Sequence, residues 1–215
     1  MPSITPATVA NLPITGPSDP IAFYRRPLVG WLFRERINMG LRLLGNRRYD
    51  KVMEVGYGAG AVLHALADSV NEMHGIDLDA DPEPVLATLA ERGRTADLRK
   101  ESVYEMPFYS DGQFDLVVSF SVFEHLHEYD KALSEVARVL RNGGHFLLGM
   151  PRVDKAMGVG FRAIGFRGID DHHVTTPASV ASRFEANGLR IVSQKRLGLG
   201  PSIASLYFTW LLEKR

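Results

Sequence analysis

Lys51-Val-Met-Glu-Val-Gly-Tyr-Gly-Ala-Gly60 is the stretch around which the rest of the chain is organised. Its apolar run, residues 52–55, ends in three alternating glycines, and residues 61–70 then carry apolar side chains at helical spacing. We therefore expect a strand, a tight loop and a helix. Glycines let the backbone turn sharply and let a ligand lie against bare main chain, and the N–H groups at a helix start suit an anion or a carboxylate.

Two classes of ligand fit this loop. Gly56-x-Gly58-x-x-Ala61, with the acidic Asp77 about 20 residues further on, satisfies the dinucleotide fingerprint. The same stretch also has the form E-x-G-x-G-x-G, in which Glu54 precedes the glycines. A pyrophosphate is repelled by a neighbouring carboxylate, whereas the ammonium of an amino acid is attracted by it. Glu54 therefore favours a ligand with positive charge near the loop.

The composition is that of one soluble α/β domain. The chain has 215 residues, and its 25 basic and 25 acidic side chains leave no net charge that would indicate nucleic acid as a partner. The absence of cysteine excludes disulfides, thiol nucleophiles and cysteine-based zinc sites. We expect no signal peptide and no membrane span, and we expect a cytoplasmic protein.

Strands and helices alternate after the glycine loop. We expect strands at 52–55, 72–77, 97–103, 114–119, 145–150, 189–195 and 205–212, and helices at 61–70, 81–96, 129–140 and 177–187. Residues 141–144 are expected to stop the third of these helices. Such alternation predicts a parallel sheet covered on both faces, with ligands at the carboxyl ends of the strands. The last two strands have only a short link, so we expect them to pair antiparallel.

Residues 1–50 and residues 151–177 do not follow this alternation of strands and helices. Five prolines within residues 1–20 predict an irregular or flexible arm without a helix. Residues 21–45 predict a helix, with Pro27 in its first turn and Gly45 at its C-cap. Seven arginines among residues 1–50 indicate either a solvated basic face or a lid that receives an anionic or membrane-borne substrate. Residues 151–177 are glycine-rich and end near Asp170-Asp-His-His173.

Further short motifs complete the pattern. They are Gly75-Ile-Asp77, Met106-Pro-Phe108, Phe114-Asp-Leu-Val-Val-Ser119, Phe123-Glu-His-Leu126 and Arg138-Val-Leu-Arg-Asn-Gly-Gly144. In this order, after Glu54-Val-Gly-Tyr-Gly-Ala-Gly60, they resemble the class I S-adenosylmethionine-dependent methyltransferases of the small-molecule type, over about residues 50–213. The chain is similar to the type 11 and ubiquinone-type members.

The resemblance implies an architecture. The family fold is a Rossmann-like, doubly wound α/β fold with a seven-stranded sheet, mostly parallel with a reversed last strand and with helices on both faces. We accordingly divide the chain into an N-terminal arm and helical lid, residues 1–50, and a methyltransferase domain, residues 51–215. Residues 151–177 are then an insertion on the substrate side of that domain.

The resemblance also implies a cofactor site for S-adenosylmethionine. The loop glycines would line the methionine part with Glu54 near its ammonium, and Asp77 would accept hydrogen bonds from both ribose hydroxyls. Ser102 stands where many relatives carry aspartate and would be a weaker acceptor for adenine. The implied binding residues are Glu54, Gly56, Tyr57, Gly58, Gly60, Asp77, Leu78, Ser102, Val103, Ser119, Phe120 and Ser121.

We therefore predict an enzyme that transfers a methyl group to a small-molecule acceptor. An oxygen nucleophile would need a base, for which His172, His173 and His125 are the candidates. Glu124-His125 also resembles the E-x-x-E-H metal cluster of some ubiquinone-type enzymes, but Ser121 replaces its first ligand, and we expect no metal.

Two alternatives stay open. One is an NAD(P)-dependent oxidoreductase, although no catalytic Tyr-x-x-x-Lys is evident, and the other is a non-catalytic cofactor-binding protein. Residues 21–48 are a candidate for association with a membrane surface. The sequence does not specify the acceptor, the atom that is methylated or the oligomeric state.

Overall fold

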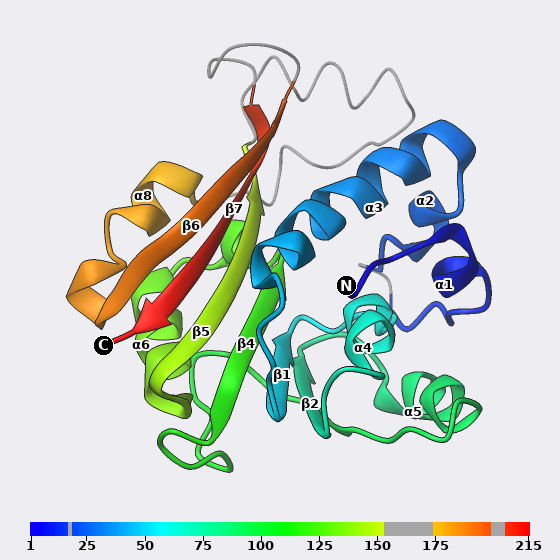
Figure 1. Cartoon of the computed structure of the whole chain (residues 1–215), viewed down its shortest axis with the longest axis horizontal. Helices are drawn as coiled ribbons and strands as arrows, with labels where there is room; N and C mark the ends of the chain where they lie inside the picture. Colours follow the sequence, from blue (N-terminus) through cyan, green and yellow to red (C-terminus); the bar gives the residue numbers. More distant parts are fainter. Residues whose placement is uncertain (17–18, 153–173, 199–204) are drawn as a thin grey trace.

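The computed structural model describes residues 1–16, 19–152, 174–198 and 205–215, and it is built on a seven-stranded sheet (Figure 1). The strands are β1 (Lys51–Val55), β2 (Glu72–Asp77), β3 (Asp97–Lys100), β4 (Phe114–Phe120), β5 (Leu140–Pro151), β6 (Leu189–Gly198) and β7 (Ser205–Lys214). Their order is β3-β2-β1-β4-β5-β7-β6. Strands β1 to β5 pair in parallel, and β7 runs antiparallel to β5 and β6. The predicted mixed sheet with a reversed last strand is therefore confirmed.

Helices cover both faces of the sheet. They are α1 (Pro6–Ala10), α2 (Ile21–Tyr24), α3 (Pro27–Leu41), α4 (Ala61–Leu66), α5 (Pro82–Ala90), α6 (Tyr129–Val139) and α8 (Pro177–Ala181), with 3-10 turns η1 (Arg42–Leu44), η2 (Phe123–His125) and η3 (Glu185–Asn187). Residues of α1 to α5 pack in one buried cluster and residues of α6 and α8 in another, on opposite faces of the sheet (Figure 1). None of these helices has the length and apolar character that crossing a bilayer requires.

The expectation of a helix-free N-terminal arm is wrong. Thr5 caps α1, because its hydroxyl accepts from the backbone N–H of Thr8 at 3.1 Å while the Thr8 hydroxyl accepts from the N–H of Thr5. Pro6 stands in the first turn, where its missing N–H costs nothing. Three apolar side chains of the arm, Ile4, Val9 and Leu12, are buried in the same cluster as α4. Thus at least part of the arm belongs to the core.

The expected helix over residues 21–45 is divided. Arg26 has an extended backbone, as a residue before proline prefers, and it separates α2 from α3. Pro27 opens α3 and Gly45, at φ 59°, caps η1, so both expected boundary residues are confirmed. Gly30 allows a close approach of the two helices, because a Cβ there would lie 2.3 Å from the carbonyl oxygen of Tyr24.

Other boundaries also differ from the expected ones. Residues 141–144 do not stop a helix but belong to β5, which begins at Leu140 and includes an irregularity opposite residues 114–116. The helices expected at 61–70 and 81–96 end at Leu66 and Ala90, and the expected third strand ends at Lys100. The helix expected at 177–187 is α8 followed by η3, and Thr176 caps it.

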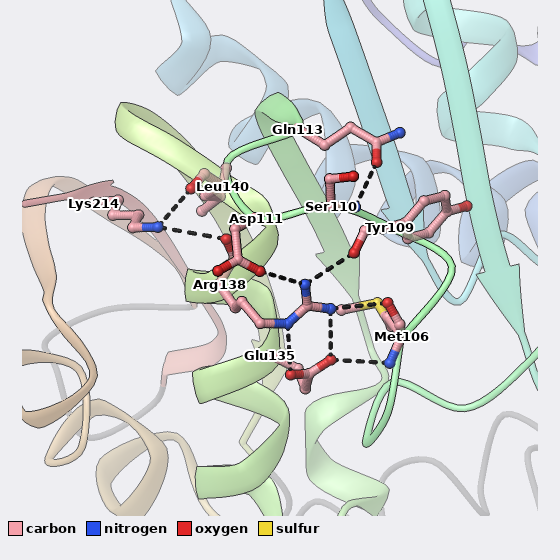
Figure 2. Close-up of polar contacts among 9 residues, drawn as sticks. All are labelled: Met106, Tyr109, Ser110, Asp111, Gln113, Glu135, Arg138, Leu140 and Lys214. Carbon is pink, nitrogen blue, oxygen red and sulfur yellow. Dashed lines mark hydrogen bonds and ion pairs between the residues drawn. The ribbon is translucent and has the colours of Figure 1, made fainter.

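Arg138 fixes the loop between β3 and β4 to α6 (Figure 2). Its guanidinium donates to the carbonyl oxygens of Met106 and Tyr109, each at 2.8–2.9 Å, and to the carboxylates of Glu135 and Asp111. Glu135 in turn accepts from the backbone N–H of Met106 at 2.9 Å. Hydrogen bonds from Arg138 lower the pKa of Glu135, so this pair stays charged. The network positions the loop on which the Met106-Pro-Phe108 motif lies.

Candidate functional site

The glycine loop lies between the carboxyl end of β1 and α4. Gly56, Gly58 and Gly60 have φ of 79°, 46° and 77°, in the left-handed region that favours glycine. A Cβ on Gly56 would lie 2.3 Å from Val122 Cγ2, and one on Gly60 would lie 2.5 Å from Val85 Cγ1. A Cβ on Gly58 meets only Asp19 Oδ1, at 4.0 Å, so here the bare backbone faces open space.

Asp77 connects the end of β2 to this loop. Its Oδ2 accepts from the backbone N–H of Gly58 at 3.0 Å, and its Oδ1 accepts from the N–H groups of Asp79 and Ala80, both at 2.9 Å. A carboxylate offers about four lone-pair sites, so capacity for a further donor remains mainly on Oδ2. Asp77 is thus a structural residue of the loop as well as a candidate ligand residue.

Glu54 is a buried acid at the end of β1. Its side chain is 3% exposed, and its Oε2 has no hydrogen-bond partner in the part of the chain that the structure describes. Burial, and next the charge of Asp77, raise the pKa of Glu54 well above its usual range. A buried unpaired carboxylate is costly, and a cation beside it would lower that cost.

Two predicted residues beside these acids differ in accessibility. Tyr57 is buried, packs against Gly75 and donates its hydroxyl to the carbonyl of Ala80 at 3.0 Å. Its side chain therefore supports the loop from beneath. Leu78, directly after Asp77, is 62% exposed and offers an apolar surface at the carboxyl end of β2.

The residues predicted to meet adenine follow β3. Ser102 is half-buried and its Oγ accepts from the backbone N–H of Tyr104 at 3.2 Å. Val103 is buried in the cluster that packs under α6. The Ser102 hydroxyl retains its own hydrogen as a donor, so the local turn does not use all of its capacity.

The residues after β4 have three different environments. Ser119 is fully buried, and its Oγ has no partner among the described residues. The ring of Phe120 packs between Gly40 of α3 and Gly149 of β5, where a Cβ would lie 2.7 Å and 2.4 Å from ring carbons. Ser121 adopts φ 59°, which a side-chain-bearing residue rarely does. Such strain is often found at functional sites.

Of the three candidate bases, only His125 lies in the described part of the chain. Its side chain is 45% exposed, and its Nε2 lies 3.9 Å from Oε1 of the buried Glu124. His172 and His173 lie outside the described residues, as does most of the insertion predicted at 151–177. The described residues contain no group of three or more potential metal-ligating side chains.

Sequence reasoning did not single out Arg36, Tyr24 and Tyr207, which the structure places near Ser121. The Tyr207 hydroxyl lies 3.1 Å from Ser121 Oγ, and Arg36 donates to the Tyr24 hydroxyl at 3.0 Å. Glu124 was considered only with His125, as part of a possible metal motif. No local pattern connects these positions, since they come together only through the fold.

Comparison with known proteins agrees with this geometry. Residues 53–148 match a family model described as a methyltransferase domain. A probable S-adenosylmethionine-dependent methyltransferase of Mycolicibacterium smegmatis is 37% identical over 100 residues, which are 46% of this chain and 37% of that protein. The ubiquinone biosynthesis O-methyltransferase of Dechloromonas aromatica is 32% identical over 113 residues, or 52% of this chain and 47% of that protein.

The predicted resemblance to the class I S-adenosylmethionine-dependent methyltransferases is therefore confirmed over residues 53–148.

Solved structures with low sequence identity share the fold of this chain. The N-methyltransferase NodS of Bradyrhizobium japonicum, in complex with S-adenosylhomocysteine, aligns with a TM-score of 0.63 at 18% identity, over 92% of this chain and 89% of that one. The cyclase SpnF aligns with a TM-score of 0.65 at 15% identity, over 86% of this chain and 82% of that one. The chain spans less than half the length of the two curated relatives above.

The residues of the loop fit the superfamily's cofactor. The unpaired oxygen of Glu54 suits an ammonium group, and the open backbone at Gly58 leaves room for a ligand. Asp77 retains acceptor capacity for a hydroxyl beside the exposed Leu78. These features lie along the carboxyl ends of adjacent strands β1 and β2, where ligands bind in doubly wound sheets.

Proposed function

We propose that this chain catalyses methyl transfer from S-adenosylmethionine to a small-molecule acceptor. The observation that carries the proposal is the joint arrangement of Glu54, Asp77 and the glycine loop, in which a buried unpaired acid, a bare backbone and a second acid adjoin. When bound, S-adenosylmethionine would supply an already activated methyl group. The protein then has to hold the nucleophile in line with that group and exclude water.

The proposed roles of the cofactor residues follow their environments. Glu54 would face the ammonium, Asp77 the ribose, and Leu78 the apolar face of the base. Ser102 and the backbone at Val103 would meet the polar edge of adenine. The backbone of residues 119–121 would border the reacting sulfur, because Val122, the next residue, packs directly on Gly56.

The buried Glu54 argues against the oxidoreductase alternative. It lies immediately before the loop on which the pyrophosphate of NAD would rest. A buried carboxyl group there offers no positive charge to a pyrophosphate and repels it whenever the group is ionised. Fold alone does not decide the reaction, because the cyclase SpnF has the same fold and its name denotes a different reaction. A turnover experiment is therefore needed to exclude the non-catalytic alternative.

A general base is required only for some classes of methyl acceptor. A hydroxyl nucleophile loses its proton as the methyl group arrives, and His125 is exposed at the correct edge of the sheet. His172 and His173 are candidates for this base on the sequence alone. An amine that is already neutral would need no base.

The wider setting is also part of the proposal. We propose a cytoplasmic enzyme that acts on a small molecule and does not bind nucleic acid, in line with its zero net charge. Residues 1–50 and 151–177 are proposed to form the acceptor side of the site. Association with a membrane surface through residues 21–48 is a further candidate, since Leu28 and Trp31 of α3 are 86% and 59% exposed.

Binding and turnover assays test the proposal separately. Calorimetry is expected to detect binding of S-adenosylhomocysteine and none of NAD. Transfer of label from methyl-labelled S-adenosylmethionine to a library of small acceptors is expected to give at least one methylated product. Binding of NAD alone would favour the oxidoreductase, and binding without any transfer across the library would favour a non-catalytic protein.

A further inference from the structure

Five polar residues from distant parts of the chain gather beside the glycine loop. Tyr24 ends α2, Arg36 lies in α3, Ser121 and Glu124 follow β4, and Tyr207 lies on β7. We call these residues the arginine cluster. The N-terminal helices contribute its only permanent charge, since an arginine does not lose its proton in proteins.

The cluster lies where a methyl group must leave the cofactor site. The side chain of Val122 covers Gly56, and the preceding residue, Ser121, has its Oγ 3.1 Å from the Tyr207 hydroxyl. The Tyr207 ring centroid is in turn 5.4 Å from the guanidinium carbon of Arg36. A chain of direct contacts therefore leads from the glycine loop to Arg36.

Arg36 is held in place but is not fully paired. It donates to the Tyr24 hydroxyl at 3.0 Å, and its guanidinium carbon lies 4.5 Å from the ring centroid of Phe33. Its Nε is buried and has no hydrogen-bond partner among the described residues. Aromatic rings thus fix the orientation of the guanidinium while part of its donor capacity is unused.

Glu124 is the acid that faces the Arg36 guanidinium, but Glu124 neutralises this charge poorly. The side chain is 1% exposed, and its Oε2 has no hydrogen-bond partner among the described residues. Burial raises the pKa of Glu124 to about 8, although its own backbone N–H and the charge of Arg36 act to lower it. The raised pKa means that burial disfavours the charged form of Glu124, so this acid neutralises Arg36 less than an exposed acid would.

We propose that the arginine cluster binds a carboxylate group of the methyl acceptor, with Arg36 as the cationic partner. The acceptors of this enzyme are then small carboxylic acids whose nucleophilic atom lies on the side toward Ser121. This inference rests on the proposed methyltransferase function and names the substrate class for it. The planar fork of an arginine matches the two oxygens of a carboxylate, and the Tyr207 hydroxyl can donate to the same group.

The experiment compares carboxylates with amides of the same shape. The whole chain is saturated with S-adenosylhomocysteine and titrated with acetate and acetamide, benzoate and benzamide, and 4-hydroxybenzoate and 4-hydroxybenzamide. In at least one pair the carboxylate is expected to bind about tenfold or more tightly than the amide, as a charge-assisted hydrogen bond implies. Arg36→Gln is expected to remove that preference without changing the affinity for S-adenosylhomocysteine.

Two further variants make the result specific to the site. Arg190→Gln removes the same charge from an exposed position at the start of β6 and is expected to keep the carboxylate preference. Tyr24→Phe keeps the charge but removes the hydroxyl that orients Arg36, so it is expected to reduce the preference severalfold. Tyr24→Phe also provides the test if Arg36→Gln does not fold.

Several outcomes would overturn the inference. Equal binding of carboxylate and amide in every pair would show that the cluster does not select anions. Equal losses in Arg36→Gln and Arg190→Gln would reduce the effect to overall charge. A fall in S-adenosylhomocysteine affinity in Arg36→Gln, with the carboxylate preference intact, would assign Arg36 to the cofactor. Failure of the parent chain to bind S-adenosylhomocysteine would instead reject the proposed function itself.

Discussion

The carboxylate of Asp77 accepts a hydrogen bond of 3.0 Å from the backbone N–H of Gly58, so the acid at the end of β2 directly holds the middle of the glycine loop. The other oxygen of Asp77 closes the turn at Asp79 and Ala80. One side chain therefore shapes two segments that would both contact a nucleotide. Substitution of Asp77 must affect ligand binding through direct contacts and through the loop.

We expect Asp77→Asn to weaken S-adenosylhomocysteine binding by about 1.5–3 kcal/mol, the usual value for a hydrogen bond to a charged group. The amide keeps one acceptor oxygen but replaces the other with a donor. Calorimetry measures the affinity, and urea unfolding separates a loosened loop from a lost contact. Glu83→Gln, an exposed acid in the first turn of α5, is the matched control. An unchanged affinity in Asp77→Asn would remove this residue from the site.

Gly58 and Gly93 allow backbone strain to be separated from ligand contact. Both have positive φ, 46° and 66°, and a Cβ has ample space at either position. Alanine at either position should cost about 1–2 kcal/mol of unfolding free energy through the left-handed backbone. Only Gly58→Ala is expected to lose S-adenosylhomocysteine affinity as well, because only this Cβ would lie in the loop. Equal affinities in the two variants would show that the ligand does not approach Gly58.

The buried side chains of α1 and its flanks predict that the arm stabilises the fold. Leu12 is 4% exposed and packs in the core cluster, whereas Ile14 is 65% exposed. Leu12→Ala should lower the unfolding free energy by about 2–5 kcal/mol, while Ile14→Ala should change it by less than about 0.5 kcal/mol. Urea unfolding of the two variants measures this difference. Similar values for both would indicate that the arm is only loosely attached.

The sheet could be predicted because its signals are local. The clearest signals are β1 and β4, which are short runs rich in apolar residues and are followed by a glycine and a serine, respectively. Helix ends were less predictable. Residues 141–144 have the composition of a helix stop, but they lie within β5, because Leu140 before them and His145 after them both pair with β4 across an irregularity. Similarly, the prolines of the arm argued against a helix, although Thr5 and Thr8 form a reciprocal cap at the start of α1.

The residues proposed for the cofactor could be named from the sequence, and those of the arginine cluster could not. Glu54, the glycines and Asp77 lie within about one βαβ unit, for which a characteristic spacing exists. Arg36, Glu124 and Tyr207 are separated by long stretches of sequence and meet only because α3 crosses the sheet beside β7. Their importance depends on burial and on unpaired atoms, neither of which a single sequence reveals.

His64 predicts how the stability of the fold depends on pH. It is 6% exposed, its Nε2 lies 3.0 Å from the Thr88 hydroxyl, and burial followed by the charge of Arg92 lowers its pKa from 6.5 to about 4. The unfolded chain therefore takes up a proton near pH 6.5 that the folded chain refuses until about pH 4. The stability linked to His64 is complete above pH 6.5 and is lost as the pH falls toward 4, by about 2 kcal/mol at pH 5.

Urea unfolding at pH 7 and pH 5 isolates this contribution. The parent is expected to lose about 2 kcal/mol more between these pH values than His64→Gln, which has no proton to take up at this position. His74 and His145 also have lowered pKa values, so they add the same sign of pH dependence to both proteins and cancel in the comparison. His127→Gln, at an exposed histidine, should behave like the parent. If His64→Gln shows the parental pH dependence, the imidazole is not held neutral by burial, and the packing of α4 against α5 must be more open than the structure indicates.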